Sequence, residues 1–157
     1  MANQKKVMTI ALIRVKDKML MGRKKKKGFG YSKWNGFGGK VESGETVDKA
    51  MIREVQEEVG LIVEEYALRG KLLFHYVADP DMETHIYEVT AYTGTPVESE
   101  EMEWRWFDTD KLPYSEMWAD DAFWMPLFLE KKQFEGEFNF DDKYNIVSNK
   151  LRVGVNE

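Results

Sequence analysis

The sequence predicts a single α/β domain spanning residues 1–157. Its length of 157 residues is enough for one apolar core and too short for two independent ones. An amphipathic helix is indicated at residues 47–59, and segments 71–77 and 84–92 alternate apolar and polar residues as strands do. We find no internal repeat or low-complexity linker, so we expect one compact unit.

The composition is that of an ordinary globular protein, and it excludes several classes of function. A net charge of -5 argues against a binder of nucleic acid polymers, which needs a basic surface. The sequence has no cysteine, so disulfides, thiolate catalysis and cysteine-ligated metals are excluded. No segment has the apolar length of a membrane span, and the polar start MANQKK lacks a signal-peptide core. We therefore expect a cytoplasmic enzyme with no membrane partner.

The first quarter of the chain predicts a hairpin followed by a binding loop. Two apolar runs, VMTIALI and MLM, flank the charged turn RVKDK between Val7 and Met21. Residues 23–40 read RKKKKGFGYSKWNGFGGK and combine lysines with five glycines. This composition favours a flexible loop whose backbone is able to approach an anion.

The rest of the chain alternates between predicted helices and strands. Thr46 and Gly60 are suited to cap the two ends of the helix at 47–59. Strands are predicted at KLLFHYV, THIYEVTAY and EWRWFD, with the turn ADPDME between the first two. DDAFWMPLFLEKK has helical spacing and an acidic start, although Pro126 disturbs its course. FEGEFNF and the last segment are predicted to be terminal strands.

The helix at 47–59 carries carboxylates at the edge of its apolar face. On a helical wheel the apolar stripe consists of Val47, Met51, Val55 and Val59. Glu57, Glu54 and Glu58 fall in an arc of roughly 100° that begins beside this stripe and ends within it, which predicts partial burial of Glu58. Carboxylates crowded there repel one another unless a cation lies among them, and oxygen ligands favour Mg²⁺ or Mn²⁺. Arg53 is placed to brace the outer edge of the cluster.

An ordinary solvated helix is the alternative, with the glutamates paired to Lys49 and Arg53. The spacing around the helix decides between the two. From Gly39 the sequence reads glycine, five residues, Glu45, seven residues and then REVQEEVGL. Roughly seven fixed positions, each with a background near 6 to 7%, coincide by chance about once in 10⁸ start sites. The segment at 39–61 therefore resembles the complete motif of the Nudix hydrolases.

This resemblance implies a Nudix fold, an α/β/α sandwich around a mixed sheet, with a loop-helix-loop that holds Mg²⁺ or its substitute Mn²⁺. It also implies that water cleaves a nucleoside diphosphate linked to another group while the metal neutralises charge. The implied metal ligands are Gly38, Gly39, Glu54, Glu57 and Glu58. Glu57 or Glu58 also orients or deprotonates the attacking water, and Glu45 and Arg53 support these residues.

Further segments resemble the animal MutT-like enzymes, which hydrolyse oxidised purine nucleoside triphosphates. These segments are GFG at 28–30, WNGFGGKV at 34–41, GTPVESEEM at 94–102, MWADD at 117–121 and the following FWMPLFLEKKQF. The resemblance implies a base pocket formed by Asn35, Trp118, Asp120 and Asp121. It implies further substrate contacts by Thr9, Lys24, Lys25, Phe29, Phe37, Lys40, Phe74, Met82 and Met102, and a metal ligand outside the helix, Glu101.

The paired aspartates also have a physical interpretation. Two adjacent carboxylates in an aromatic pocket do not both ionise easily, so the pKa of one rises and that acid donates a hydrogen bond. Exchange of this proton between Asp120 and Asp121 lets one pocket accept 8-oxoguanine or 2-hydroxyadenine. An ordinary acidic helix N-terminus is the alternative. For the lysines at 24–27, the alternatives are phosphate contacts, a solvated loop and a nuclear-localisation patch.

The resemblance thus implies a monomeric Mg²⁺-dependent enzyme that converts 8-oxo-dGTP and 2-hydroxy-dATP to the monophosphate and pyrophosphate. One alternative is a Nudix enzyme for a methylated purine nucleotide, a dinucleoside polyphosphate, ADP-ribose or capped RNA. Another is a non-catalytic nucleotide-binding module, which retention of all three glutamates disfavours. We expect small nucleotides as partners, no nucleic acid polymer, and a cytoplasmic location with a nuclear or mitochondrial fraction.

Overall fold

The computed structural model describes residues 5–26 and 32–154, and it begins with the predicted hairpin. β1 (Lys6–Val15) and β2 (Lys18–Lys24) pair in antiparallel register, with Ile13 opposite Leu20. Leu12 and Ile13 are both fully buried although they point to opposite faces of the sheet. A strand covered on both faces buries both sets of side chains, which explains the continuous apolar run VMTIALI.

Part of the glycine-rich segment is more regular than the sequence predicted. β3 (Trp34–Asn35) pairs with β2 through Gly22 and Arg23. The following backbone then runs along β1, where Phe37 N donates to Ala11 O at 3.0 Å. The prediction of one flexible loop over 23–40 is therefore wrong for residues 34–40, because pairing with β1 and β2 holds them against the sheet.

α1 (Val47–Val59) has the predicted bounds. Thr46 occupies the N-cap position, but its hydroxyl donates to Asp48 Oδ1 at 2.6 Å and makes no cap to the backbone. Gly60 ends the helix at φ 77, and its N–H donates to Gln56 O at 3.0 Å. This left-handed conformation strains any residue with a Cβ, so glycine is the residue the helix end requires.

Long strands form the centre of the sheet. β4 (Ile62–His75) and β5 (Met82–Thr93) are antiparallel neighbours, and β6 (Met102–Asp108) pairs with β2. β4 begins well before the predicted segment KLLFHYV. Register shifts between Val63 and Gly70 interrupt the alternation of apolar and polar side chains, so the start of β4 left no period-2 pattern in the sequence.

The C-terminal part supplies a second helix and a hairpin. The short 3-10 helix η1 (Tyr114–Glu116) precedes α2 (Asp121–Leu129), which contains Pro126 and continues past it with one backbone donor missing. β7 (Phe134–Phe140) and β8 (Ile146–Val153) are the predicted terminal strands, and they pair as an antiparallel hairpin.

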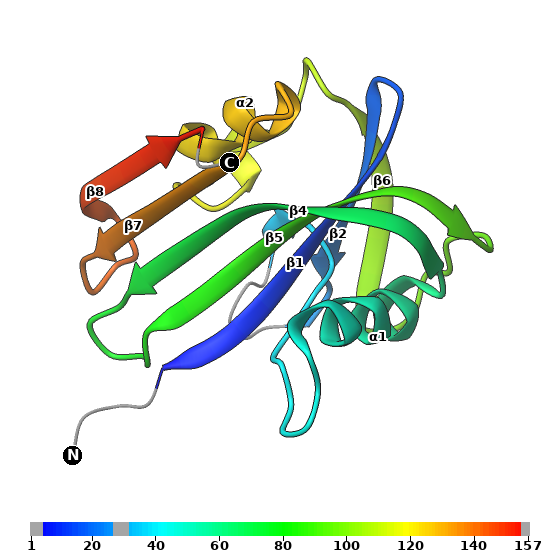
Figure 1. Ribbon diagram of the computed structural model, residues 1–157, viewed down its shortest axis with the longest axis horizontal. Helices are drawn as coiled ribbons and strands as arrows, with labels where there is room; N and C mark the ends of the chain where they lie inside the picture. Colours follow the sequence, from blue (N-terminus) through cyan, green and yellow to red (C-terminus); the bar gives the residue numbers. More distant parts are fainter. Residues whose placement is uncertain (1–4, 27–31, 155–157) are drawn as a thin grey trace.

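The described strands form one mixed sheet with a helix on each face (Figure 1). The strand order is β3-β2-β1-β5-β4-β7-β8 with β6 beside β2, and the β1–β5 and β4–β7 pairs are parallel. α1 packs on one face through Met51 and Val55, whereas α2 packs on the other through Trp124 and Phe128. The predicted α/β sandwich around a mixed sheet is confirmed. Within the described ranges, no helix has the length and apolar character needed to cross a membrane.

Candidate active site

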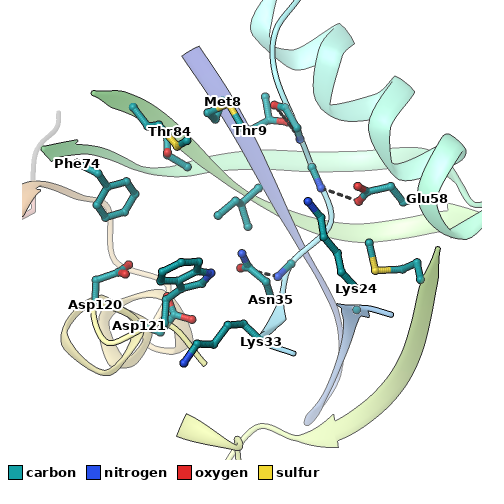
Figure 2. A pocket seen from close by; sticks show the side chains of 18 of the residues that line it. Met8, Thr9, Lys24, Lys33, Asn35, Glu58, Phe74, Thr84, Asp120 and Asp121 are labelled. Atoms are coloured by element: carbon teal, nitrogen blue, oxygen red, sulfur yellow. Dashed lines mark hydrogen bonds between the residues drawn. The ribbon is translucent and has the colours of Figure 1, made fainter. Parts of the chain in front are cut away.

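A pocket lies between the ends of the two helices and gathers most of the residues that the sequence singled out. Figure 2 shows Glu58 at the end near α1, Asp120 and Asp121 at the opposite end, and Asn35 between them. The lining consists of Met8, Thr9, Ile10, Gly22, Lys24, Lys33, Asn35, Gly36, Gly38, Gly39, Glu58, Phe74, Tyr76, Met82, Thr84, Met102, Trp118, Asp120 and Asp121. The pocket thus joins a carboxylate end to an end that is both aromatic and acidic.

Glu58 is the carboxylate of α1 that enters the pocket. Its Oε1 accepts a hydrogen bond from Gly38 N at 3.0 Å. Burial raises the pKa of Glu58 to about 8; the Gly38 N–H and Lys24 oppose this rise, whereas Glu54 and Glu57 add to it. A carboxyl that is this costly to ionise gains stability from a bound cation, so the position is a functional candidate. The partial burial predicted from the helical wheel is confirmed.

Arg53 holds the other carboxylates of the motif in place. Its Nε and Nη2 donate to the Glu45 carboxylate at 2.7 and 2.9 Å, and Nη2 also donates to Lys40 O at 3.2 Å. Nη1 contacts Glu54 at 3.0 Å and Glu57 at 3.2 Å. The hydrogen bond from Arg53 lowers the pKa of Glu45 to about 2. Arg53 therefore joins the loop before α1 to the carboxylates on the helix.

Two glycines bring backbone close to these carboxylates. A Cβ at Gly38 would lie 1.8 Å from Thr9 O, and a Cβ at Gly39 would lie 2.6 Å from Glu54 Oε2. Thr9 N also donates to Gly39 O at 2.9 Å, which fixes this backbone against β1. A Cβ at Gly38 would overlap the backbone of β1, so glycine is required there, whereas a Cβ at Gly39 would displace the carboxylate of Glu54.

The carboxylate end fits a divalent cation held in an open site. Across residues 5–26 and 32–154, no three acidic or histidine side chains converge as a closed ligand set. Glu54 and Glu57 turn toward Arg53, and Glu58 turns toward Gly38. Mg²⁺ is commonly held by one or two carboxylates together with waters and substrate phosphates, so a closed set is unnecessary. The oxygen donors present therefore fit this ion.

Asp120 and Asp121 form the opposite end of the pocket at the start of α2. They are only 5% and 3% exposed. Asp120 Oδ2 accepts a hydrogen bond from Trp124 Nε1 at 2.8 Å, whereas Asp121 Oδ2 has no hydrogen-bond partner in the described part of the chain. Burial raises the pKa of both carboxyls, and the neighbouring Asp120 raises the pKa of Asp121 further. Asp121 is therefore the harder of the two carboxyls to ionise, which favours Asp121 as the holder of a proton shared by the pair.

Flat side chains and an amide line the space between the two ends. Asn35 Oδ1 accepts a hydrogen bond from Gly36 N at 2.8 Å, which orients the amide. Phe74 is 6% exposed, and Lys33 Nζ lies 5.9 Å from the centre of the Trp118 ring. A slot with aromatic walls and a few directed polar groups suits a planar base.

The structure places Phe37 and Lys40 outside the pocket. Phe37 is fully buried in the core beneath α1, because its pairing with Ala11 turns the ring to that face of the sheet. Lys40 is exposed and does not line the pocket. These two predicted substrate contacts therefore lie outside the pocket that the structure forms.

Three further predicted residues are not brought to the pocket. Lys25 Nζ donates to Ser99 O at 2.7 Å and pairs with Glu98. Glu101 is 72% exposed, pairs with Lys26 at 2.9 Å and does not line the pocket. Phe29 lies outside the described residues.

The pocket also contains residues that the sequence analysis missed. Tyr76 lies two residues beyond Phe74, and Thr84 lies two residues beyond Met82. Because side chains two apart on a strand share a face, this alternation was the signal that identifies both. Lys33 precedes β3 in irregular backbone, where no periodic signal exists.

Comparison with known proteins gives four consistent findings. Residues 3–128 match the family model described as NUDIX domain. The chain is 46% identical over 147 residues to an oxidized purine nucleoside triphosphate hydrolase of Danio rerio, covering 93% of this chain and 94% of that protein. It is 44% identical over 145 residues to the protein of the same name in Mus musculus, covering 92% of each. The crystal structure of a MutT protein from Bacillus halodurans superposes with a TM-score of 0.82 at 22% identity, covering 93% of this chain and 97% of that chain, which shows the shared fold.

Proposed function

This chain belongs to the NUDIX domain family, and on that premise we propose that it hydrolyses oxidised purine nucleoside triphosphates. The expected substrates are 8-oxo-dGTP and 2-hydroxy-dATP, and the products are the nucleoside monophosphate and pyrophosphate. One observation carries the proposal: the aspartate pair and Glu58 lie at opposite ends of the same pocket. A nucleotide bound along the pocket presents its base to the aspartates and its phosphates to Glu58.

Nudix hydrolases act with a divalent cation, and we propose Mg²⁺ for this chain. When bound, the ion neutralises charge on the phosphates and lowers the pKa of water. Glu54, Glu57 and Glu58 are the side chains proposed to hold it, next to the backbone of 38–39. Lys24 lines the same end of the pocket, and its charge lowers the pKa of Glu58. This position supports a contact between Lys24 and phosphate.

The proposed reaction breaks one bond and forms one. The oxygen of water bonds to phosphorus, the P–O bond that links the monophosphate to the pyrophosphate breaks, and pyrophosphate takes the electron pair. The proton that water loses passes to a carboxylate of α1. Glu58 suits this role because burial brings its pKa to about 8, near the working pH of a general base.

The base end supports a preference for oxidised purines. Oxidation at position 8 of guanine or position 2 of adenine changes which edge atoms donate and which accept. A pocket with one protonated and one ionised carboxyl accommodates such an edge, and Asn35 adds an amide beside it. Because a buried polar group without a partner is costly, a base with the wrong pattern binds more weakly.

A small free nucleotide is the partner that this pocket supports. The net charge of -5 opposes binding of a nucleic acid polymer, since no excess of basic groups compensates for many phosphates. We propose that the chain acts as a monomer on single nucleotides, which gel filtration of the active fraction tests directly.

An assay that separates and quantifies the nucleotide products over a panel of substrates tests the proposed function, with released pyrophosphate measured for each nucleoside triphosphate. The panel contains 8-oxo-dGTP, 2-hydroxy-dATP, their undamaged parents, a methylated purine nucleotide, ADP-ribose and a dinucleoside polyphosphate, each with Mg²⁺ and with chelator. We expect kcat/KM for the oxidised purines to exceed that for the parents by at least about tenfold. A preference for ADP-ribose or dinucleoside polyphosphates would overturn the substrate assignment, and no turnover of any nucleotide would overturn hydrolysis itself.

A further inference from the structure

The turn between β7 and β8 carries a tyrosine that the turn itself does not require. Asp141 builds this turn: its Oδ1 accepts from Lys143 N at 2.8 Å and from Asn145 N at 2.9 Å. Tyr144 lies within it at φ 63, in the left-handed region that glycine and asparagine adopt with least strain. Tyrosine is a strained choice at such a position, which points to a role for its side chain.

The side chain of Tyr144 reaches two segments that are distant in sequence. Its hydroxyl donates to Asp79 Oδ2 at 2.6 Å, in the loop 76–81 between β4 and β5. This loop and the β7–β8 turn lie at the same edge of the molecule (Figure 1). The Tyr144 ring lies edge-on to Trp118, with 5.8 Å between ring centres and an interplanar angle of 77°. It is also edge-on to Tyr76 at 5.8 Å.

Trp118 and Tyr76 both line the pocket, whereas Tyr144 does not. Trp118 lies in irregular backbone between η1 and α2, so no regular hydrogen-bond ladder sets the direction of its ring. Tyr76 follows the last residue of β4 and stacks on Phe140, with 5.2 Å between ring centres. Trp118 and Tyr76 form an aromatic wall of the pocket. Contacts with rings outside the pocket, those of Tyr144 and Phe140, therefore orient these two rings.

We infer that Tyr144 is a positioning residue that sets the aromatic wall at the base end of the pocket. It acts through Trp118 and Tyr76 and is itself anchored by Asp79, so it affects how tightly a purine base is held. This inference rests on the proposed function, because it assigns the base to that end of the pocket. Tyr144 does not line the pocket, so it acts on a bound base only through Trp118 and Tyr76.

Tyr144→Gly separates this role from a structural one. Glycine relieves the backbone strain at φ 63, so the turn is kept while the ring is lost. We expect KM for 8-oxo-dGTP to rise about 3- to 10-fold, in the range of one aromatic pair, with kcat changed less than about twofold. The carboxylate end is untouched, which is why kcat is retained. Tyr144→Phe keeps the ring and is expected to restore most of the wild-type KM.

Tyr66 offers a matched control on another part of the surface. It is also 37% exposed, its hydroxyl donates to Asp48 Oδ2 at 2.7 Å, and its ring lies edge-on to Tyr87 at 5.8 Å. Neither Asp48 nor Tyr87 lines the pocket. Tyr66→Ala removes the same kind of contacts and is expected to leave KM within about twofold of wild type.

Wild type is assayed first, so the two proposals fail separately. If it hydrolyses oxidised purine nucleotides and Tyr144→Gly leaves KM unchanged, or lowers Tm and kcat together, the inference is overturned and the function stands. If wild type turns over none of them, the proposed function is overturned. The orientation of the Trp118 ring is measured independently of activity, from the NMR chemical shift of its indole N–H. This resonance is assigned by its loss in Trp118→Phe. A Tyr144→Gly spectrum in which that resonance keeps its shift overturns the inference.

Discussion

Glu58 is buried, and it is also proposed to take the proton from water. Its replacement by glutamine is therefore expected to lower activity without lowering stability. Burial raises its pKa to about 8, so ionising it in the folded protein costs free energy. Glu58→Gln keeps an acceptor for Gly38 N and removes the ionisable group. We expect kcat to fall by about 10²- to 10⁴-fold, the range for losing a catalytic acid or base. Tm at pH 8.5, measured in chelator, is expected to hold or rise.

The sign follows from proton linkage. A carboxyl whose pKa is raised in the folded state binds more protons there than in the unfolded state, so stability falls as pH rises from about 4.5 toward about 8. Removing the group abolishes that loss. Glu65→Gln, on an exposed part of β4, is the control and should change neither kcat nor Tm. A fall in the Tm of Glu58→Gln at pH 8.5 as large as for a core truncation would contradict this account.

Asp121 gives a second prediction, based on its unpartnered oxygen. If this buried oxygen carries a proton for the substrate base, Asp121→Asn retains a donor and Asp121→Ala does not. We expect kcat/KM for 8-oxo-dGTP to fall roughly 10- to 100-fold in Asp121→Ala, and by less than about tenfold in Asp121→Asn. Asp110, an exposed acid, provides the same pair of variants as a control. Equal losses in both Asp121 variants would argue against proton donation.

Side-chain spacing predicted some of these residues and missed others for a physical reason. The burial of Glu58 and the exposure of Glu57 follow from helical periodicity, and the structure has both. Phe37 was predicted to contact substrate, but strand pairing with Ala11 decides which face its ring takes. Glu101 was predicted to bind metal, yet a nearby lysine attracts its carboxylate. Neither a facing strand nor an opposite charge can be found from the local sequence.

At the scale of elements, His75 links three parts of the sheet through charge. Its Nδ1 contacts Asp81 at 2.8 Å, just before β5, and its Nε2 contacts Glu137 on β7. Burial lowers the pKa of His75, but the hydrogen bonds with Glu137 and Asp81 outweigh it and the net shift is upward. A raised pKa means that the folded state holds the proton more tightly. This stabilisation is complete below about pH 6.5 and is lost as pH rises through the folded-state pKa.

We therefore expect His75→Gln to lower Tm more at pH 5.5 than at pH 8.5, by about 1 to 3 °C for a partly exposed pair in a chain of this size. Thermal melts at the two pH values measure the difference. His85→Gln is the control, because His85 contacts one carboxylate, Glu83, at 2.8 Å instead of bridging two elements. The same loss at both pH values would show that His75 stabilises by packing alone.

The elements themselves were predictable where their periodicity is unbroken. α1 and the strand at 134–140 have the predicted bounds because each carries a clear pattern and ends at a clear breaker. The start of β4 was missed because bulges interrupt its alternation, and β3 was missed because glycine-rich residues read as a loop. In both cases hydrogen bonds from a neighbouring strand hold the backbone, and no local propensity reveals them.

At the scale of the whole molecule, the two ends of the pocket belong to opposite layers. Glu58 lies on α1, which packs on one face of the sheet, and the aspartate pair begins α2, which packs on the other. The pocket extends past β1, which pairs in parallel with β5. No pattern within either segment predicts that they share a cavity. Only the resemblance to a family, which implies both a metal site and a base pocket, connected the two segments from the sequence.

Because the carboxylate end joins α1 to the backbone paired with β1, a cation bound there stabilises the fold as a whole. At free Mg²⁺ about ten times its Kd, linkage adds about 1.4 kcal/mol and raises Tm by about 3 to 6 °C. A ligand carboxyl must release its proton first, and the pKa of Glu58 is about 8. The Mg²⁺-induced rise in Tm should therefore be larger at pH 9 than at pH 6, relative to chelator at equal ionic strength. In Glu58→Gln the rise should be smaller and independent of pH; an equal rise at both pH values in wild type would remove Glu58 from the proposed ligands.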